Sequence, residues 1–374
     1  MLKPLLTISV LAFTTQAALV QADQVIELPV ESTRAEVTLD YANARSVQPK
    51  LTGALDLDLN ANSAVRAAGQ AGFTQGGVGS GQTSPVQLLD SATSESLAQQ
   101  AVADSRAYGT AGLPFTTSRV DMGGLQLSKV DYFRRAGRLF FKVGADTGVC
   151  SASLIKPGVV VTAAHCVAEF GSNTGYTNFQ YIPAYYKGQA PYGVWTAAKV
   201  YVMDSYLNGS ASCAQPGIVC TNDIAVIKLA PKAGKYAGQQ TGWFGYAWGG
   251  FGFVEGKTQI TQLGYPSSHD GGELMQRTDA GGQVFAEVSN NTVIGSRQTG
   301  GSSGGPWLVN FGEAAKLQGT TLGIDGKMNI VVGTTSWGPN DSALKFMGAS
   351  PFTSANIVPL MKAACPAANT AGCK

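Results

Sequence analysis

Charge is scarce in this sequence, in which only 13% of the residues are Asp, Glu, Lys or Arg. The 26 basic and 24 acidic residues nearly cancel, and no run of Lys and Arg is interleaved with aromatic residues. Nucleic acids and anionic membrane surfaces are bound by clustered basic residues. We therefore expect neither of them as a partner.

Metal-binding patterns and long apolar runs are missing as well. There are 2 histidines, and no Cys-x-x-Cys pair or His-rich cluster indicates a zinc site. Beyond the N-terminus, no stretch approaches the ~20 apolar residues of a membrane span. We expect no metal, no cofactor and no membrane-spanning helix.

A short apolar run does occur at the N-terminus. Lys3 precedes the run from Leu5 to Phe13, and small residues then lead to Ala22. This is the pattern of a secretory signal peptide that is cleaved after Ala22. The mature protein is expected to be a soluble monomer, secreted either to the periplasm or out of the cell.

The six cysteines are expected to form disulfides, because an exported protein reaches an oxidising compartment in which all of them can pair. Six cysteines allow many connectivities, which the sequence alone leaves open. We favour the pairings that are near in sequence and close plausible loops: Cys150 with Cys166, Cys213 with Cys220, and Cys365 with Cys373.

The residues from 23 to 114 differ in composition from the rest. They are rich in Ala, Gln, Ser, Gly and Thr and contain no cysteine or tryptophan, so they can bury little. We expect a weakly ordered segment with one helix from Leu97 to Ala107. It is either a linker or a pro-region that is removed or docks on the rest. We favour a pro-region, because every cysteine lies beyond it; the main domain then spans 115–374.

Short β-type runs separated by Gly, Pro, Asn and Asp follow residue 114. Without helical periodicity between them, they favour an all-β fold, either two small closed barrels or one large sandwich. The best helix candidate runs from Ser354 to Ala364, and Pro359 inside it allows a start later than Ser354. Expected strands are 138–143, 149–155, 159–162, 194–202, 223–229, 259–265, 293–294 and 330–337.

A glycine-rich run from Thr299 to Trp307 carries two adjacent serines, Ser302 and Ser303. Glycine permits positive φ and close approach to backbone N–H groups, so the run predicts a tight loop that presents a hydroxyl and a pair of donors. A flexible Gly/Ser linker is the alternative interpretation.

A serine hydroxyl needs a neighbouring base to become a nucleophile, and histidine is the usual one. His165 follows an apolar strand and precedes Cys166, whereas His269 lies in a polar turn and is expected to be solvated. Asp223, at the start of an apolar strand, can orient such a base; its alternative role is to form a turn.

Taken together, these residues resemble the chymotrypsin-like serine proteases from about Phe115 to the C-terminus. Further similarity in 136–141 and 299–307 points to the secreted bacterial branch that includes glutamyl endopeptidases. The resemblance implies two antiparallel β-barrels of the chymotrypsin type with a C-terminal helix, and protein or peptide substrates. The matching motifs are Thr162-Ala163-Ala164-His165-Cys166, Asn222-Asp223-Ile224-Ala225, Gly301-Ser302-Ser303-Gly304-Gly305-Pro306 and Ser336-Trp337-Gly338.

The resemblance also implies a role for each matching residue. Ser303 is the nucleophile, His165 the base and then the acid, and Asp223 the group that orients His165. The N–H groups of Gly301 and Ser303 form the oxyanion hole. Residues 336–338 pair with the substrate backbone, with Gly338 at the entrance to the S1 pocket, and Cys150 and Cys166 match the disulfide of the histidine loop.

Two departures from the family pattern bear on activation and specificity. Ser302 stands where trypsin-type members have the Asp that pairs with the new N-terminus, so any activation must use other contacts. Thr335 and Ser336 stand where glutamyl endopeptidases place a histidine. Arg297 lies near the S1 floor and can favour an acidic side chain, or else it is an exposed arginine on a variable loop.

Two other functions fit parts of the pattern. The spacing Gly301-x-Ser303-x-Gly305 also occurs at the nucleophile of α/β-hydrolase esterases, but those enzymes place their histidine after the serine, and no histidine follows His269. A catalytically silent binding protein with the protease fold is the second alternative.

Overall fold

The computed structural model describes residues 23–30, 38–47, 71–104, 111–122, 124–211, 222–285, 288, 291–314, 325–339 and 344–374. The expected signal peptide, 1–22, lies outside them. Within the described residues, no helix combines the length and apolar character needed to cross a membrane.

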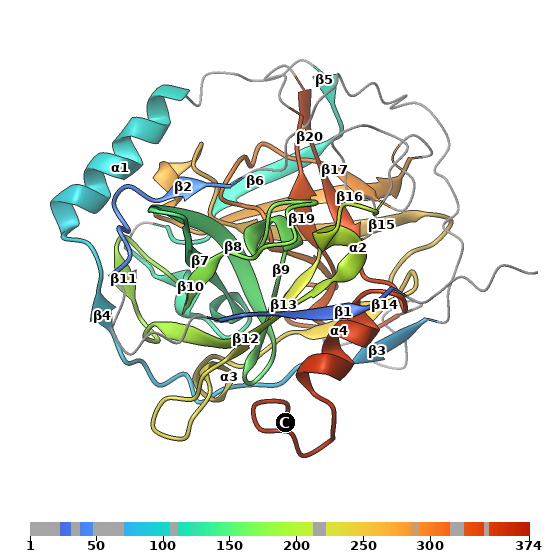
Figure 1. Cartoon of the computed structure of the whole chain (residues 1–374). Helices are drawn as coiled ribbons and strands as arrows, with labels where there is room; N and C mark the ends of the chain where they lie inside the picture. The colour runs from blue at the N-terminus through green and yellow to red at the C-terminus, as the bar shows by residue number, and fades with distance from the viewer. Residues whose placement is uncertain are drawn as a thin grey trace, which may run out of the picture.

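Six strands close into a first barrel in the order β12-β10-β7-β8-β9-β13, and a pairing of β12 with β13 completes the ring (Figure 1). Apolar side chains from these strands fill its centre, among them Leu139, Leu154 and Val160, all fully buried. The strands are β7 (Ala136–Val143), β8 (Asp146–Lys156), β9 (Val159–Thr162), β10 (Thr177–Pro183), β12 (Trp195–Met203) and β13 (Ala225–Leu229).

A second barrel follows in the order β19-β18-β15-β16-β17-β20, closed by the pairing of β19 with β20. Two closed barrels are therefore present, as expected, rather than one sandwich. Its strands are β15 (Lys257–Gly264), β16 (Gln276–Val284), β17 (Thr292–Gly295), β18 (Pro306–Val309), β19 (Ile330–Trp337) and β20 (Leu344–Pro351).

Strand β16 was not among the strands expected from the sequence. Its sequence QRTDAGGQV is polar and glycine-rich, yet it pairs along its length with β15 and also with β6 (Phe115–Arg119). Buried and more exposed residues alternate along it. Its tertiary neighbours make it a strand where its own propensity does not.

The C-terminal helix α4 (Ile357–Ala364) starts later than Ser354, as the position of Pro359 allows. Asn356, and not Ser354, is its N-cap, and the Asn356 side chain accepts hydrogen bonds from the N–H groups of Ile357 and Thr353. Pro359 then falls in the first turn, where a missing N–H costs no helical hydrogen bond. The helix buries Ile357 and Leu360 against the barrels.

Much of the segment from 23 to 114 is attached to the barrels, and its described residues are better ordered than the weakly ordered segment expected from its composition. Strand β1 (Val25–Leu28) pairs with β12 and buries Leu28, and α1 (Ser91–Asp104) packs on the turn η4 (Asp270–Gly272) (Figure 1). Helix α1 begins six residues before the predicted Leu97. The segment docks because it adds strands to exposed sheet edges.

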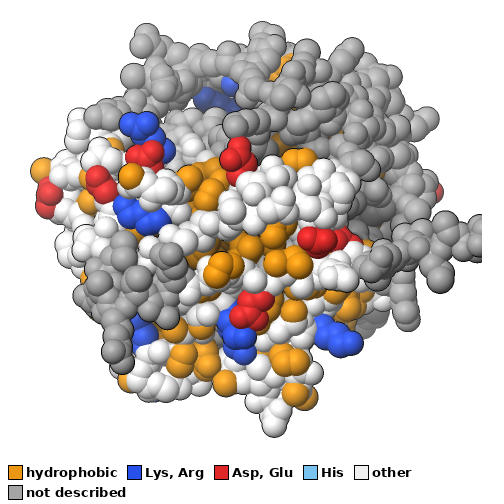
Figure 2. Space-filling view, viewed as in Figure 1, with side chains coloured by type: hydrophobic (Ala, Val, Ile, Leu, Met, Phe, Trp, Pro, Cys, Tyr) orange, Lys and Arg blue, Asp and Glu red, His pale blue; other side chains and the backbone are white. Residues whose placement is uncertain are grey.

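The remaining elements are short and connect or extend the barrels. Charged side chains are sparse and scattered over the face seen in Figure 2, in keeping with the composition. These elements are β2 (Arg45–Ser46), β3 (Gly72–Thr74), β4 (Val86–Gln87), β5 (Ala111–Gly112), η1 (Leu127–Lys129), η2 (Phe133–Arg135), η3 (Ala164–Cys166), β11 (Gln189–Ala190), α2 (Asp204–Leu207), α3 (Ala237–Thr241) and β14 (Gly245–Trp248).

Candidate active site

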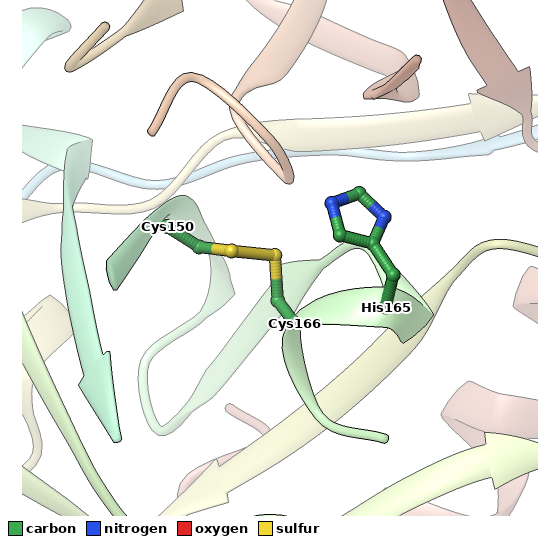
Figure 3. A group of neighbouring side chains, drawn as sticks. All are labelled: Cys150, His165 and Cys166. Carbon is green, nitrogen blue, oxygen red and sulfur yellow. A yellow bond between two sulfur atoms is a disulfide. The ribbon is translucent and has the colours of Figure 1, made fainter. Parts of the chain in front are cut away.

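His165 lies in η3, directly after β9, and is buried. Its neighbour Cys166 forms a disulfide with Cys150 of β8, so the histidine turn is joined covalently to the barrel. Figure 3 shows the imidazole ring beside this disulfide. The two sulfurs and a ring nitrogen all lie within 4.8 Å of one another, but the disulfide leaves this cluster no thiolate with which to hold a metal ion.

Strand pairing brings Asp223 to His165. Thr162 of β9 lies opposite Ala225 of β13, so the residues that follow Thr162 meet those that precede Ala225. One carboxylate oxygen of Asp223, Oδ1, accepts the backbone N–H of His165 at 2.8 Å, and the other, Oδ2, lies 2.8 Å from Nδ1 of the ring. Both side chains are buried. The contact holds the ring in the tautomer whose Nδ1 carries the proton and whose Nε2 can accept one.

Ser303 is held against the same strands by its backbone. Its carbonyl accepts a hydrogen bond from the N–H of Ser151 at 2.8 Å. The next residue, Gly304, has φ +76°, and a Cβ there would lie 2.0 Å from Oγ1 of Thr162, three residues before His165. Only glycine allows so close an approach, and it brings the serine loop to the end of β9.

The second ring nitrogen of His165, Nε2, is unpaired among the described residues. The atom is buried as well. The Ser303 hydroxyl is therefore not hydrogen-bonded to Nε2 in this conformation. Such contacts commonly tighten only when substrate is bound.

Ser336 joins this group from the second barrel. Its hydroxyl donates a hydrogen bond to Oδ2 of Asp223. The N–H of Gly304 donates to the carbonyl of Thr335 at 2.8 Å, and this hydrogen bond aligns β19 with the serine loop. Residues from both barrels thus meet at Asp223, His165 and Ser303.

Two backbone N–H groups of the serine loop were predicted to act as oxyanion donors. In the part of the chain that the structure describes, neither the N–H of Gly301 nor that of Ser303 donates to a protein acceptor. The carbonyl of Gly300 accepts the N–H of Ser267 at 2.8 Å. A trans peptide directs its C=O and N–H to opposite sides, so this hydrogen bond turns the N–H of Gly301 away from Ser267. Gly301 has φ +94°, which favours glycine.

Ser302 stands where trypsin-type proteases have an Asp, and it forms hydrogen bonds within its own loop. It is fully buried, and its hydroxyl donates to the carbonyl of Thr299 at 2.6 Å. Its N–H also donates to that carbonyl, at 3.1 Å. Ser302 thereby closes the turn that precedes Ser303.

Four of the predicted substrate-binding residues, 335–338, lie in β19 or directly after it. The hydroxyl of Thr335 accepts hydrogen bonds from the indole of Trp307 at 2.8 Å and the amide of Gln262 at 3.0 Å. Trp337 donates its indole N–H to Asn291, and its ring meets Phe346 edge to face. Gly338 is half-buried, and a Cβ there would lie 3.5 Å from the methyl carbon of Met347.

The sequence analysis did not identify three buried polar residues in this region, Gln262, Ser296 and Gln298. Ser296 donates its hydroxyl to the Gln262 side chain at 2.8 Å, and Gln298 donates to Thr278 at 3.2 Å. The Oε1 atom of Gln298 is buried with no partner among the described residues. Glutamine and serine carry no motif, so only their tertiary positions identify this neutral polar network.

His269 and Arg297 lie near one another at the edge of the site. His269 is half-buried rather than solvated, which corrects the sequence expectation, and its Nδ1 lies 2.8 Å from the hydroxyl of Ser268. Burial first, and then the positive charge of Arg297, lower the pKa of His269. Arg297 is half-buried and has interaction partners of its own, so it is not the exposed arginine of the alternative interpretation.

Of the other predicted disulfides, Cys365–Cys373 forms at the C-terminus. Cys213 and Cys220 lie outside the described residues.

Comparisons with known proteins assign the chain to a family. A family model described as Trypsin matches residues 134–356, more than half of the chain. A comparison with curated proteins finds no match.

Three solved structures are similar to the chain. Thermostable serine protease AL20, from an extremophilic microorganism, is 23% identical with a TM-score of 0.51, covering 62% of this chain and 97% of that one. Protease Anisep from Arthrobacter nicotinovorans is 25% identical, with a TM-score of 0.49 and coverage of 63% and 96%. A Glu endopeptidase is 18% identical, with a TM-score of 0.47 and coverage of 66% and 96%. The likeness to AL20 shows a shared fold.

Proposed function

The chain belongs to the trypsin family of chymotrypsin-like serine proteases, and we propose that it is a secreted serine endopeptidase that acts through Ser303, His165 and Asp223. The trypsin-like fold supports a protease function. The observation that carries the proposal is the double contact of Asp223 with His165, which leaves Nε2 of a buried imidazole open beside the serine loop.

Peptide cleavage then proceeds in two halves. Nε2 of His165 takes the proton of the Ser303 hydroxyl as Oγ bonds to the substrate carbonyl carbon. The tetrahedral intermediate collapses, His165 protonates the leaving amine, and the acyl group stays on Ser303. Water then attacks the acyl carbon, with His165 again as base, and the new carboxylic acid leaves Ser303. Asp223 stabilises the imidazolium formed in each half.

The N–H groups of Gly301 and Ser303 act on the carbonyl oxygen, which becomes an oxyanion in each half of the reaction. Donors that are already oriented lower the barrier without reorganising, and each is worth about 2.7–4 kcal/mol. Neither group has an acceptor in the described part of the chain, which supports this role. The substrate backbone adds as a strand along Ser336 and Trp337.

The side chain that precedes the cleaved bond faces two kinds of polar group. The network of Gln262, Ser296 and Thr335 is neutral, whereas the nearby Arg297 offers positive charge. Arg297 is the proposed partner of an acidic side chain there. Thr335 and Ser336 replace the histidine of glutamyl endopeptidases, so we propose no strict requirement for glutamate.

Export and processing complete the proposal. Residues 1–22 form the signal peptide, 23–114 the pro-region and 115–374 the protease domain of a zymogen. The formed disulfides fit an oxidising compartment. The docking of β1 and α1 on the barrels fits a pro-region that binds the domain it precedes.

The test is cleavage of denatured casein by the purified mature protein, cut between the pro-region and the protease domain, followed by mass spectrometry of the products of a peptide library. The wild type and the exposed control variant Ser210→Ala should cleave casein, whereas Ser303→Ala should not, with an unchanged circular dichroism spectrum. The library products then report the residue before the cleaved bond. A folded wild type that cleaves no peptide bond contradicts the proposal and favours the silent binding protein; cleavage of esters alone favours an esterase.

A further inference from the structure

Glu273, a residue with no catalytic role in the mechanism above, is a fully buried carboxylate. Nη1 of Arg138 donates to its Oε1 at 2.8 Å, and the Tyr185 hydroxyl lies 2.9 and 2.8 Å from its two oxygens. The hydroxyl of Ser94 donates to Oε2 at 2.6 Å. Burial raises the pKa of Tyr185, so its hydroxyl stays protonated and donates to Glu273.

A buried ion pair of this kind costs desolvation free energy, which only good geometry and further hydrogen bonds offset. Glu273 meets that condition, and its backbone is held as well. Its carbonyl accepts the N–H of Lys187 at 2.9 Å, and its N–H donates to the carbonyl of Asp270 at 2.8 Å. The C-terminal end of the 265–273 loop is therefore fixed in place.

The other end of the same loop contacts the proposed oxyanion donors. The N–H of Ser267 donates to the Gly300 carbonyl at 2.8 Å, and the N–H of Ser268 donates to the Thr299 hydroxyl at 3.2 Å. A Cβ on Gly301 would lie 2.5 Å from the carbonyl of Tyr265. Because the Ser267 hydrogen bond sets the plane of the Gly300–Gly301 peptide, the loop that Glu273 anchors also orients the N–H of Gly301.

Helix α1 closes over this loop from the predicted pro-region. Ser94 is a helix residue, and its side chain is buried against Glu273. A Cβ on Gly271 would lie 2.4 Å from the carbonyl of Leu97, so helix and loop are in direct backbone contact. Loss of α1 would remove the Ser94 donor from Glu273.

We propose that Glu273 is a positioning residue for the oxyanion donor Gly301, and that α1 supports it through Ser94, so that α1 raises the catalytic rate when it remains docked after the pro-region is cut from the protease domain. Ser302 carries no charge and cannot form the ion pair that the corresponding Asp forms in trypsin-type proteases. Glu273 orders the serine loop instead. The inference rests on the proposed protease function.

The experiment compares Ser94→Ala with Ser96→Ala, the same change at an exposed position of the same helix. Each protein, in the form in which it is isolated, is assayed for kcat and KM on a peptide amide and for inhibition by a peptide aldehyde, whose adduct places an oxyanion in the site. Denaturing mass spectrometry establishes whether the chain that carries Ser94 is present, and thermal unfolding reports stability.

We expect Ser94→Ala to lower kcat and aldehyde affinity together by about threefold or more, with KM unchanged and Ser96→Ala equal to wild type. Glu273→Gln should act in the same direction by about tenfold or more, since removal of one oxyanion donor costs about 10²–10³ in kcat. If Glu273→Gln does not fold, Ser94→Ala decides alone.

Three results overturn the inference while leaving the protease function intact. They are a Ser94→Ala protein with wild-type kcat, a loss of stability with no change in aldehyde affinity, and an active wild type from which the peptide carrying Ser94 is absent. A wild type that cleaves nothing overturns both proposals.

Discussion

Asp223 holds His165 at two points, since its Oδ1 accepts the backbone N–H and its Oδ2 faces Nδ1 of the ring, each at 2.8 Å. The first contact fixes the position of the histidine backbone. The second fixes the tautomer, because a carboxylate can only accept a proton in a hydrogen bond. One buried carboxylate therefore determines both where the imidazole lies and which nitrogen is free to act.

Asp223→Asn removes this control with little change in volume. The amide can offer its NH₂ group to Nδ1, and the proton then resides on Nε2, which can no longer serve as base. We expect kcat to fall by about 10⁴-fold, as such a tautomer change does in this chemistry. Steady-state kinetics on a peptide amide measure it, and Asp204→Asn, in nearby α2, is the matched control. A drop of less than tenfold would contradict the assignment.

Ser336→Ala should lower kcat without abolishing it. The Ser336 hydroxyl donates to the buried Asp223 carboxylate, and a hydrogen bond to a charged group is worth about 1.5–3 kcal/mol. We expect a loss of about tenfold, at the lower end of this range. Ser350→Ala, on the adjacent β20, removes a buried hydroxyl that has no partner among the described residues, and it should leave kcat unchanged. Equal effects of the two changes would mean that Ser336 matters only for packing.

Removal of the Cys150–Cys166 disulfide should affect both stability and rate. The bridge spans 16 residues and holds the turn that carries His165, so Cys150→Ala/Cys166→Ala should lower the free energy of unfolding by about 3 kcal/mol and also lower kcat. The pair Cys365→Ala/Cys373→Ala spans 8 residues far along the chain and should lower stability only. Urea unfolding and kcat at a temperature where both variants are folded give the comparison. An unchanged kcat in the first pair would show that packing alone holds the histidine turn.

His269 predicts a pH dependence of stability. Burial and the charge of Arg297 lower its pKa in the folded protein, below the value of about 6.5 for an unfolded chain. The unfolded state therefore binds this proton first as the pH falls, so the stability that neutral His269 contributes is present above about pH 6.5 and is lost below it. His269→Gln removes the titration. Calorimetry between about pH 5 and 7 should show a steeper fall of the unfolding temperature in the wild type. Parallel curves would contradict the shift.

Sequence reasoning reaches the candidate triad because each member sits in a short local pattern. His165 follows a strand of Val residues, Asp223 precedes one, and Ser303 lies among glycines whose positive φ and close contacts the structure explains. Their mutual geometry was not predictable from these patterns. It depends on the pairing of Thr162 with Ala225 and on the contact of Ser336 with Asp223, which is 113 residues away.

What sequence reasoning misses is tertiary in origin. The contact between Ser94 and Glu273 spans 179 residues, and neither residue stands in a motif. The same holds for the polar network at Gln262, and for β16, whose polar sequence becomes a strand through its neighbours. Among the described residues before 115, β1 and β3 are held by sheet edges on the barrels and not by their own composition.

The central claim is that Ser303 is the nucleophile activated by His165, and labelling with a fluorophosphonate probe tests it most directly. Intact mass spectrometry of the folded wild type should show one covalent adduct, and peptide mapping should place it on Ser303. The adduct should be absent from Ser303→Ala and should form far more slowly in Asp223→Asn. A folded, unlabelled wild type, or an adduct on any other residue, would contradict the account.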